Sequence, residues 1–155
     1  MQINWLILIL FIIGCNLLGA IGTFWTNADS DWYNNLNKPP FNPPSWLFAP
    51  VWIFLFSLMG IALYFVFFSS SSQVRTIALV LFVIQFVLNI LWSYFFFGAH
   101  NPLFALIEIV FLLILIILTS VYFFKSNILS GALMIPYVLW VGFASFLNYS
   151  IWRIN

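Results

Sequence analysis

Long apolar stretches separated by short polar breaks dominate the pattern of this chain. No charged side chain occurs before Asp29, between Lys38 and Arg75, or between Lys125 and Arg153. A helix rises about 1.5 Å per residue, so about 20 apolar residues cross a hydrocarbon layer roughly 30 Å thick. Stretches of this length predict helices that span a lipid bilayer.

Five apolar segments follow one another, at residues 3–25, 46–68, 76–98, 103–124 and 130–152. Backbone amides in hydrocarbon must be satisfied within the segment, and the alternation expected of a β-barrel is missing. No Lys or Arg precedes the first segment, which is longer than the apolar core of a signal peptide, so we expect it to be retained. The prediction is an all-α integral membrane protein, a five-helix bundle in one domain over residues 1–155.

The connections between these segments differ in length. Residues 26–45 form a polar, Pro-rich loop, whereas the other breaks are short turns near 69–72, 100–102 and 126–127. Only the first loop is long enough to fold over the helices, and loops of this kind often carry function. We therefore expect it to form a lid between the first and second spans.

Composition narrows the class of protein further. The chain is 65% hydrophobic and 5% charged, far from the balance of a water-soluble domain. Its net charge of +1 and scattered basic residues offer no surface for nucleic acid. Arg75 and Lys125 lie on one predicted side of the membrane and Lys38 and Arg153 on the other, so the positive-inside rule leaves the orientation open.

Seven of the eight tryptophans lie in the predicted spans, where they form two groups. Four lie at span ends, where an indole is stable at the boundary between lipid and water: Trp5, Trp25, Trp46 and Trp152. Trp52, Trp92 and Trp140 lie inside three different spans. We expect these three indoles to meet in the half of the bundle beneath the long loop.

Two sets of residues recur every four positions, one on the third span and one on the fifth, and each set forms one stripe on its helix. The stripes are Gln85, Asn89 and Ser93 on the third span, and Trp140, Ala144 and Asn148 on the fifth. Lipid penalises exposed polar groups, so both stripes should face inward. They fit either interhelical hydrogen bonds that hold the bundle together or an aromatic pocket for a small molecule.

Catalytic motifs are sparse. Glu108 is the only carboxylate within a predicted span, which makes it a functional candidate, although it could instead reach headgroup water or pair with Lys38 or Arg153. His100, in a short turn, fits a solvated interface residue better than a haem ligand. The sequence holds no metal-ligand spacing, phosphate-binding glycine loop or G-x-S-x-G motif, so hydrolytic or metal-dependent chemistry is not supported.

Several segments together resemble one known family. They are WYNNLNKPPFNPP at 32–44, FAPVW at 48–52, LNILWSYFFF at 88–97, PYVLW at 136–140 and FASFLN at 143–148. The chain resembles the tryptophan-rich sensory proteins of the TspO/MBR family, whose animal members are called translocator protein or peripheral-type benzodiazepine receptor. The match runs from Trp32 to the carboxyl end in the same order and spacing.

This resemblance implies a homodimeric five-helix membrane protein that needs no metal or cofactor and takes porphyrin or haem as a ligand. Animal members bind isoquinoline-type drugs and cholesterol as well. In the family the first loop covers a pocket within the helices. Mapped by motif, the ligand-binding positions are Trp32, Tyr33, Trp52, Asn89, Trp92, Trp140, Ala144 and Asn148, with Lys38 as a carboxylate partner on the loop.

Three functions fit these observations. The first is a tetrapyrrole-binding sensor or carrier in a bacterial cell membrane; the second is a light-dependent porphyrin-degrading enzyme in which Trp52 and Trp140 react; the third is a membrane scaffold whose aromatics only pack. A weak sterol-contact pattern is formed by Leu147, Tyr149 and Arg153. The same residues also fit an interface anchor at the helix end.

Overall fold

The computed structural model describes residues 3–69 and 72–155, so the predicted turn at 69–72 lies partly outside the described residues. Five of its helices are long and apolar enough to cross a membrane, which confirms the predicted fold class. The elements are α1 Trp5–Gly19 with η1 Ala20–Phe24, α2 Asp31–Asn35, η2 Ser45–Leu47, α3 Phe48–Phe67, α4 Ser72–Ser93 with η3 Tyr94–Gly98, α5 Pro102–Ser126 and α6 Ile128–Ile154.

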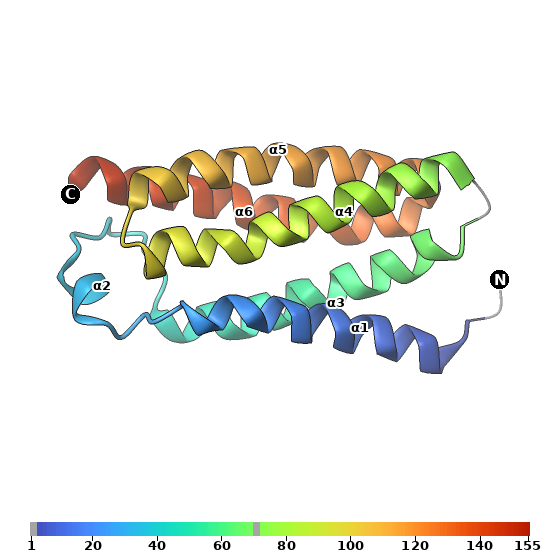
Figure 1. The fold of residues 1–155 in the computed structure, drawn as a ribbon, viewed down its shortest axis with the longest axis horizontal. Helices are drawn as coiled ribbons and strands as arrows, with labels where there is room; N and C mark the ends of the chain where they lie inside the picture. The colour runs from blue at the N-terminus through green and yellow to red at the C-terminus, as the bar shows by residue number, and fades with distance from the viewer. Residues whose placement is uncertain (1–2, 70–71) are drawn as a thin grey trace.

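The long helices lie side by side in two groups (Figure 1). α5 packs along both α4 and α6, while α1 packs along α3. α3 meets the second group mainly through α6 and touches α4 and α5 much less. The short α2 lies at the end of the bundle where α6 finishes, and α1 begins at the opposite end, as an odd number of spans requires.

Asparagine caps set the beginnings of the last two spans. Asn101 accepts a 3.0 Å hydrogen bond from the amide of Phe104, and Pro102 occupies the first turn, where its missing N–H costs nothing. Asn127 accepts from the amide of Leu129 at 2.8 Å. These caps satisfy backbone donors at two tight connections that join antiparallel helices.

The helix boundaries extend beyond the apolar segments. α4 begins at Ser72 rather than at residue 76, and α5 continues to Ser126, because polar residues at a membrane boundary can remain helical. The long loop also contains a helix of its own. α2 is capped by Ser30, whose hydroxyl accepts from the amide of Tyr33 at 3.3 Å.

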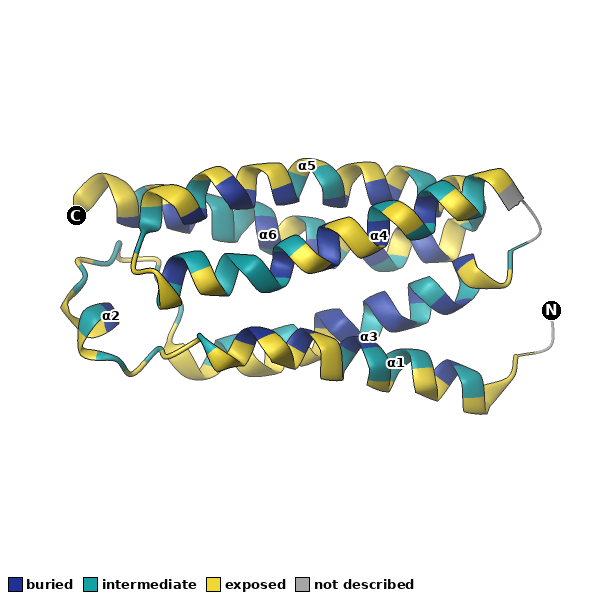
Figure 2. Cartoon of the chain, in the orientation of Figure 1, coloured by how far each residue is buried: buried dark blue, intermediate teal, exposed yellow. Residues whose placement is uncertain are grey.

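Buried positions face one another between the helices, while most of the outer surface is apolar and exposed (Figure 2). α1 and α3 approach closely at Gly60, where an added Cβ would lie 2.7 Å from the Cα of Ile12. Trp5 and Trp46 are 67% and 72% exposed, as expected of boundary residues. Trp25 is half-buried because its ring packs on Tyr94.

Candidate functional site

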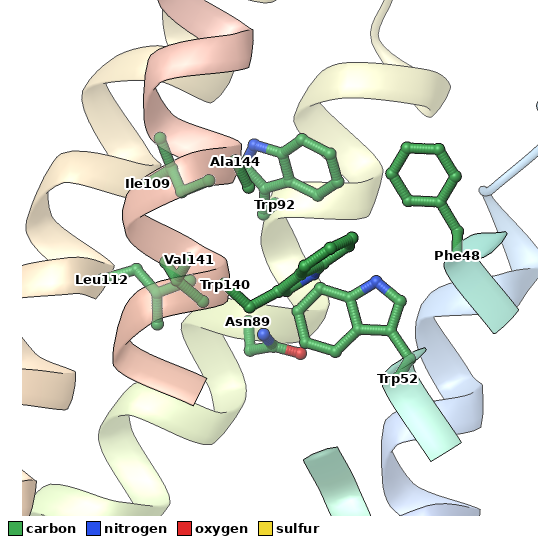
Figure 3. Close-up of a pocket in the computed structure, with 9 residues that line it drawn as sticks. All are labelled: Phe48, Trp52, Asn89, Trp92, Ile109, Leu112, Trp140, Val141 and Ala144. Carbon is green, nitrogen blue, oxygen red and sulfur yellow. The ribbon is translucent and has the colours of Figure 1, made fainter. Parts of the chain in front are cut away.

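The three inner tryptophans converge on one small cavity between four spans (Figure 3). Trp52 enters from α3, Trp92 from α4 and Trp140 from α6. The cavity has a volume of about 30 Å³. Its lining consists of Phe48, Trp52, Asn89, Trp92, Ile109, Leu112, Trp140, Val141 and Ala144.

Contacts between aromatic rings hold in place the side of the cavity that α3 contributes. Trp52 stacks on Phe56 with centroids 5.3 Å apart and meets the edge of Tyr137 at 6.3 Å. One turn earlier, Phe48 makes an edge contact with Trp140 at 6.1 Å. Such offset and edge arrangements are the favoured geometries of aromatic pairs. The wall therefore consists of packed rings that join α3 to α6.

A buried polar network borders this cavity. The Asn89 side-chain amide donates to the Tyr137 hydroxyl at 3.0 Å, and that hydroxyl donates to the Gln85 carbonyl oxygen at 2.9 Å. Gln85 is fully buried and Asn89 nearly so, which confirms that the stripe on this span faces inward. Asn89 is the member that lines the cavity, so it offers a polar group to a guest among aromatic neighbours.

Asn148 acts beside the cavity without lining it. Its side-chain oxygen accepts from the indole N–H of Trp92 at 3.0 Å, and its amide donates to the carbonyl of Pro102 at 2.8 Å. The residue is 1% exposed. Asn148 therefore orients Trp92 and holds the start of α5, whereas Ala144, one turn earlier on α6, keeps a small side chain at the cavity wall.

The loop residues Tyr33 and Lys38 lie at the end of the bundle, outside the cavity lining. Tyr33 is 4% exposed and packs on Phe96 and Phe97, with the Lys38 ammonium 4.0 Å from its ring centroid. Burial raises the pKa of Tyr33, and a hydrogen bond with Asn42 lowers it by less. The loop thus packs against the end of the bundle through Tyr33. Its action as a lid remains a prediction.

Trp32, the other predicted loop residue, lies farther out. Its indole stacks on the imidazole of His100 at 4.5 Å and touches the edge of Phe96 at 5.6 Å. It does not line the inner cavity. The structure therefore separates the predicted residues into five that surround one space and four that support or flank it.

Glu108 is 8% exposed, and neither of its carboxylate oxygens has a hydrogen-bond partner within residues 3–69 and 72–155. The suggested pairing with Lys38 or Arg153 is wrong for this structure. Lys38 lies over the ring of Tyr33, and Arg153 is exposed near the end of α6. Glu108 is instead held on the buried side of α5.

The residues of the sterol-contact pattern do not share one face. Leu147 is 7% exposed and packs inside the bundle, whereas Tyr149 is 45% exposed. The Tyr149 ring lies 6.0 Å from that of Trp152, close to the exposed Arg153. This outward aromatic and basic group fits an anchor at the membrane boundary.

Four cavity residues were absent from the predicted set: Phe48, Ile109, Leu112 and Val141. Phe48 precedes Trp52 by four positions and Val141 precedes Ala144 by three, so helical periodicity could have suggested both. Ile109 and Leu112 carry no such signal, because an aliphatic side chain facing a cavity and one facing lipid look alike in sequence.

Comparison with known proteins shows the family of the chain. The model of the TspO/MBR family matches residues 9–153. The chain is 42% identical to tryptophan-rich protein TspO of Chlorobaculum tepidum over 91% of this chain and 90% of that protein. It is 40% identical to the protein of the same name from Archaeoglobus fulgidus, over 98% and 99%. Translocator protein of Sus scrofa is 33% identical, over 92% and 89%.

These matches cover nearly the whole chain and include all five spans. Together with the five apolar helices they make the chain an integral membrane protein, and the bacterial relative supports a location in a bacterial cell membrane. On this similarity the chain belongs to the TspO/MBR family.

Proposed function

We propose that this chain binds tetrapyrroles within the membrane, as a sensor or carrier that holds a planar hydrophobic ring between α3, α4 and α6. The observation that carries the proposal is the convergence of Trp52, Trp92 and Trp140 on one cavity bordered by Asn89 and Ala144. Indole faces suit a flat macrocycle, and a few placed polar groups can orient it. Names such as translocator protein among the relatives support a binding role of this kind.

The volume of the cavity shows what binding requires. About 30 Å³ is room for little more than a water molecule, whereas sites for organic ligands usually measure roughly 300–1,000 Å³. Entry of a macrocycle must therefore separate the walls. We expect the pair α1–α3 to move, since α3 meets the other spans mainly through α6 and touches α4 and α5 only sparsely. Phe48 and Trp52 lie on α3 and would move outward with it.

The loop is coupled to this movement. It leads through η2 directly into α3, so a shift of α3 displaces the loop as well. Lys38, at present above the ring of Tyr33, is the basic residue of the loop. In the open form its ammonium would attract the propionate groups of a porphyrin. On this proposal the loop acts as a lid and Lys38 as a carboxylate partner.

A titration with protoporphyrin in lipid nanodiscs tests the proposal. Wild-type protein should change the porphyrin fluorescence in a saturable manner, and Trp52→Phe and Trp140→Phe should weaken binding about tenfold, the loss of ~1.4 kcal/mol of contact. Trp5→Phe is the matched control, because it removes an indole that faces outward. Equal affinities for all four proteins would refute the pocket, and the absence of saturable binding to the wild type would favour the scaffold alternative.

A second candidate is light-dependent degradation of porphyrin. Trp52 and Trp140 both line the cavity, so an excited porphyrin held there could take one electron from an indole, with dioxygen as the final oxidant. Illumination in air should then remove the Soret band faster than for free porphyrin. A Trp140→Phe variant that binds porphyrin but bleaches it at the free rate would favour the enzyme, and equal bleaching with and without protein would exclude it.

A further inference from the structure

A second and larger hollow lies at the outer end of the bundle. It measures about 450 Å³ and shares no lining residue with the inner cavity. α2, the turn between α4 and α5, and the end of α6 form its walls, with the residues Trp32, Leu36, His100, Asn101, Pro102, Leu103, Trp152 and Asn155. Its size falls within the range of sites for organic ligands. We name it the outer groove.

The turn after η3 places an imidazole in the outer groove. The backbone closes through bonds from Ala99 to Tyr94 at 2.7 Å and from Asn101 to Phe95 at 3.1 Å. His100, between the two donors, has a φ of 52°, in the left-handed region that glycine usually occupies at helix ends. Histidine is among the side chains that adopt this region more readily than most, so the turn can hold the imidazole in the outer groove.

The edge of the His100 ring, which carries its two nitrogens, is free to bind a ligand. It lies on the indole of Trp32 with centroids 4.5 Å apart and planes 14° from parallel. Face-to-face stacking leaves the two ring nitrogens at the edge of the stack. Within the described part of the chain, neither nitrogen makes a hydrogen bond, and the residue is exposed. The imidazole is therefore oriented by its neighbour while its lone pair stays available.

Hydrogen bonds hold the two walls of the outer groove together. The amide of Asn37, in the loop after α2, donates to the side-chain oxygen of Asn155 at 2.9 Å. The side-chain amide of Asn155 donates back to the carbonyl of Asn37 at 3.0 Å and to that of Ile151 at 2.8 Å. This reciprocal pair joins the loop to α6, so the outer groove exists before any ligand arrives.

Sequence alone favours a solvated role for His100, but its place in the lining of the outer groove supports another. We propose that the outer groove binds the metallated form of a tetrapyrrole, such as ferric haem, with His100 as an axial ligand. A nitrogen lone pair of the imidazole forms a bond to the iron and displaces a weakly held water molecule, with no change of oxidation state. Leu36, Leu103 and Trp152 supply apolar contacts for the macrocycle. A metal-free ring has no iron for the imidazole nitrogen to bind, so the outer groove should favour the metallated form.

This inference rests on the proposed tetrapyrrole binding and adds a site with its own selectivity. His100→Gly tests it, because glycine suits the left-handed backbone and the turn is retained. His100→Asn is a second variant, since asparagine also tolerates this region. Ferric haem and metal-free protoporphyrin are titrated separately into each protein in nanodiscs, with the Soret band and the affinity as readouts.

Wild-type protein should shift the Soret band of haem to a form with imidazole bound. Both variants should lose that shift and bind haem at least about tenfold more weakly, while their affinity for protoporphyrin changes less than about twofold. Added imidazole should restore the shift in the His100→Gly protein. An unchanged haem spectrum in both variants would overturn the assignment, as would an equal loss of affinity for haem and for protoporphyrin.

The same titrations separate the two proposals. Binding of both tetrapyrroles with no dependence on His100 would leave the inner site standing and remove the outer one. A haem shift that depends on His100, with no binding of protoporphyrin, would support the outer groove and contradict the proposed inner site.

Discussion

The indole nitrogen of Trp92 donates a 3.0 Å hydrogen bond to the side-chain oxygen of Asn148, which links α4 to α6 beside the inner cavity. Asn148 is 1% exposed and also donates to the carbonyl of Pro102 at 2.8 Å. One amide thus holds a cavity wall and the beginning of α5. In a low-dielectric interior, loss of such a group leaves its partners without an alternative.

Replacement of Asn148 by alanine should therefore destabilise the bundle. The N–H of Trp92 would be left unpaired, at a cost of about 1–3 kcal/mol, and the thermal midpoint should fall by several degrees, roughly 2–8 °C. Ser150→Ala is the matched control on the same helix, because its hydroxyl bonds only to the carbonyl of Phe146. Circular dichroism during heating measures both, and equal midpoints would contradict this role of Asn148.

The buried hydroxyl of Tyr137 should also stabilise the bundle through its hydrogen bonds. It accepts from Asn89 and donates to Gln85, so Tyr137→Phe removes two hydrogen bonds at once. We expect a loss of roughly 1–3 kcal/mol and a lower thermal midpoint. Tyr149→Phe, which alters an exposed ring near the end of α6, should leave the midpoint unchanged. A stable Tyr137→Phe protein would show that the network does not hold the helices.

Tyr33 should titrate above its ordinary pKa of 10.0, because burial beneath the loop disfavours the phenolate more than the hydrogen bond with Asn42 favours it. In the unfolded chain the phenol ionises at lower pH. The contribution of Tyr33 to folding is therefore fully present below pH 10 and is lost as the pH rises toward its folded value.

Ultraviolet absorbance of the phenolate tests this expectation. The titration of Tyr33→Phe is subtracted from that of the wild type, and the difference isolates Tyr33 among the six tyrosines. A midpoint above 10 agrees with burial of the ring. A midpoint at or below 10 would mean that the loop leaves Tyr33 in contact with water.

Much of the fold follows from the spacing of charges and apolar residues. Five uninterrupted apolar segments are long enough for a bilayer, and five helices result. The apolar pattern locates the helix ends less well, since Ser72 and Ser126 remain helical although they are polar. It does not predict the helix Asp31–Asn35, because a one-turn helix in a polar loop has no apolar period and only its cap at Ser30 marks it.

The cavity was partly predictable for a similar reason. Tryptophans and amides within spans stand out against an aliphatic background, and Trp52, Asn89 and Trp140 indeed line one space. Depth and periodicity do not tell a lining residue from a supporting one. The sequence therefore predicts Asn148 as a ligand contact, whereas in the structure it binds the indole of Trp92. The position of Tyr33 depends on tertiary packing against η3, which local sequence does not specify.

The most direct test of the inner site adds a phenyl ring to the cavity. Ala144 lines the cavity, whereas Gly142 on the same helix has nothing within 4 Å of an added Cβ. Ala144→Phe should fill the space and weaken protoporphyrin binding at least about tenfold, and Gly142→Phe should leave it within about twofold of the wild type. Equal affinities for Ala144→Phe and wild-type protein would contradict binding between these indoles.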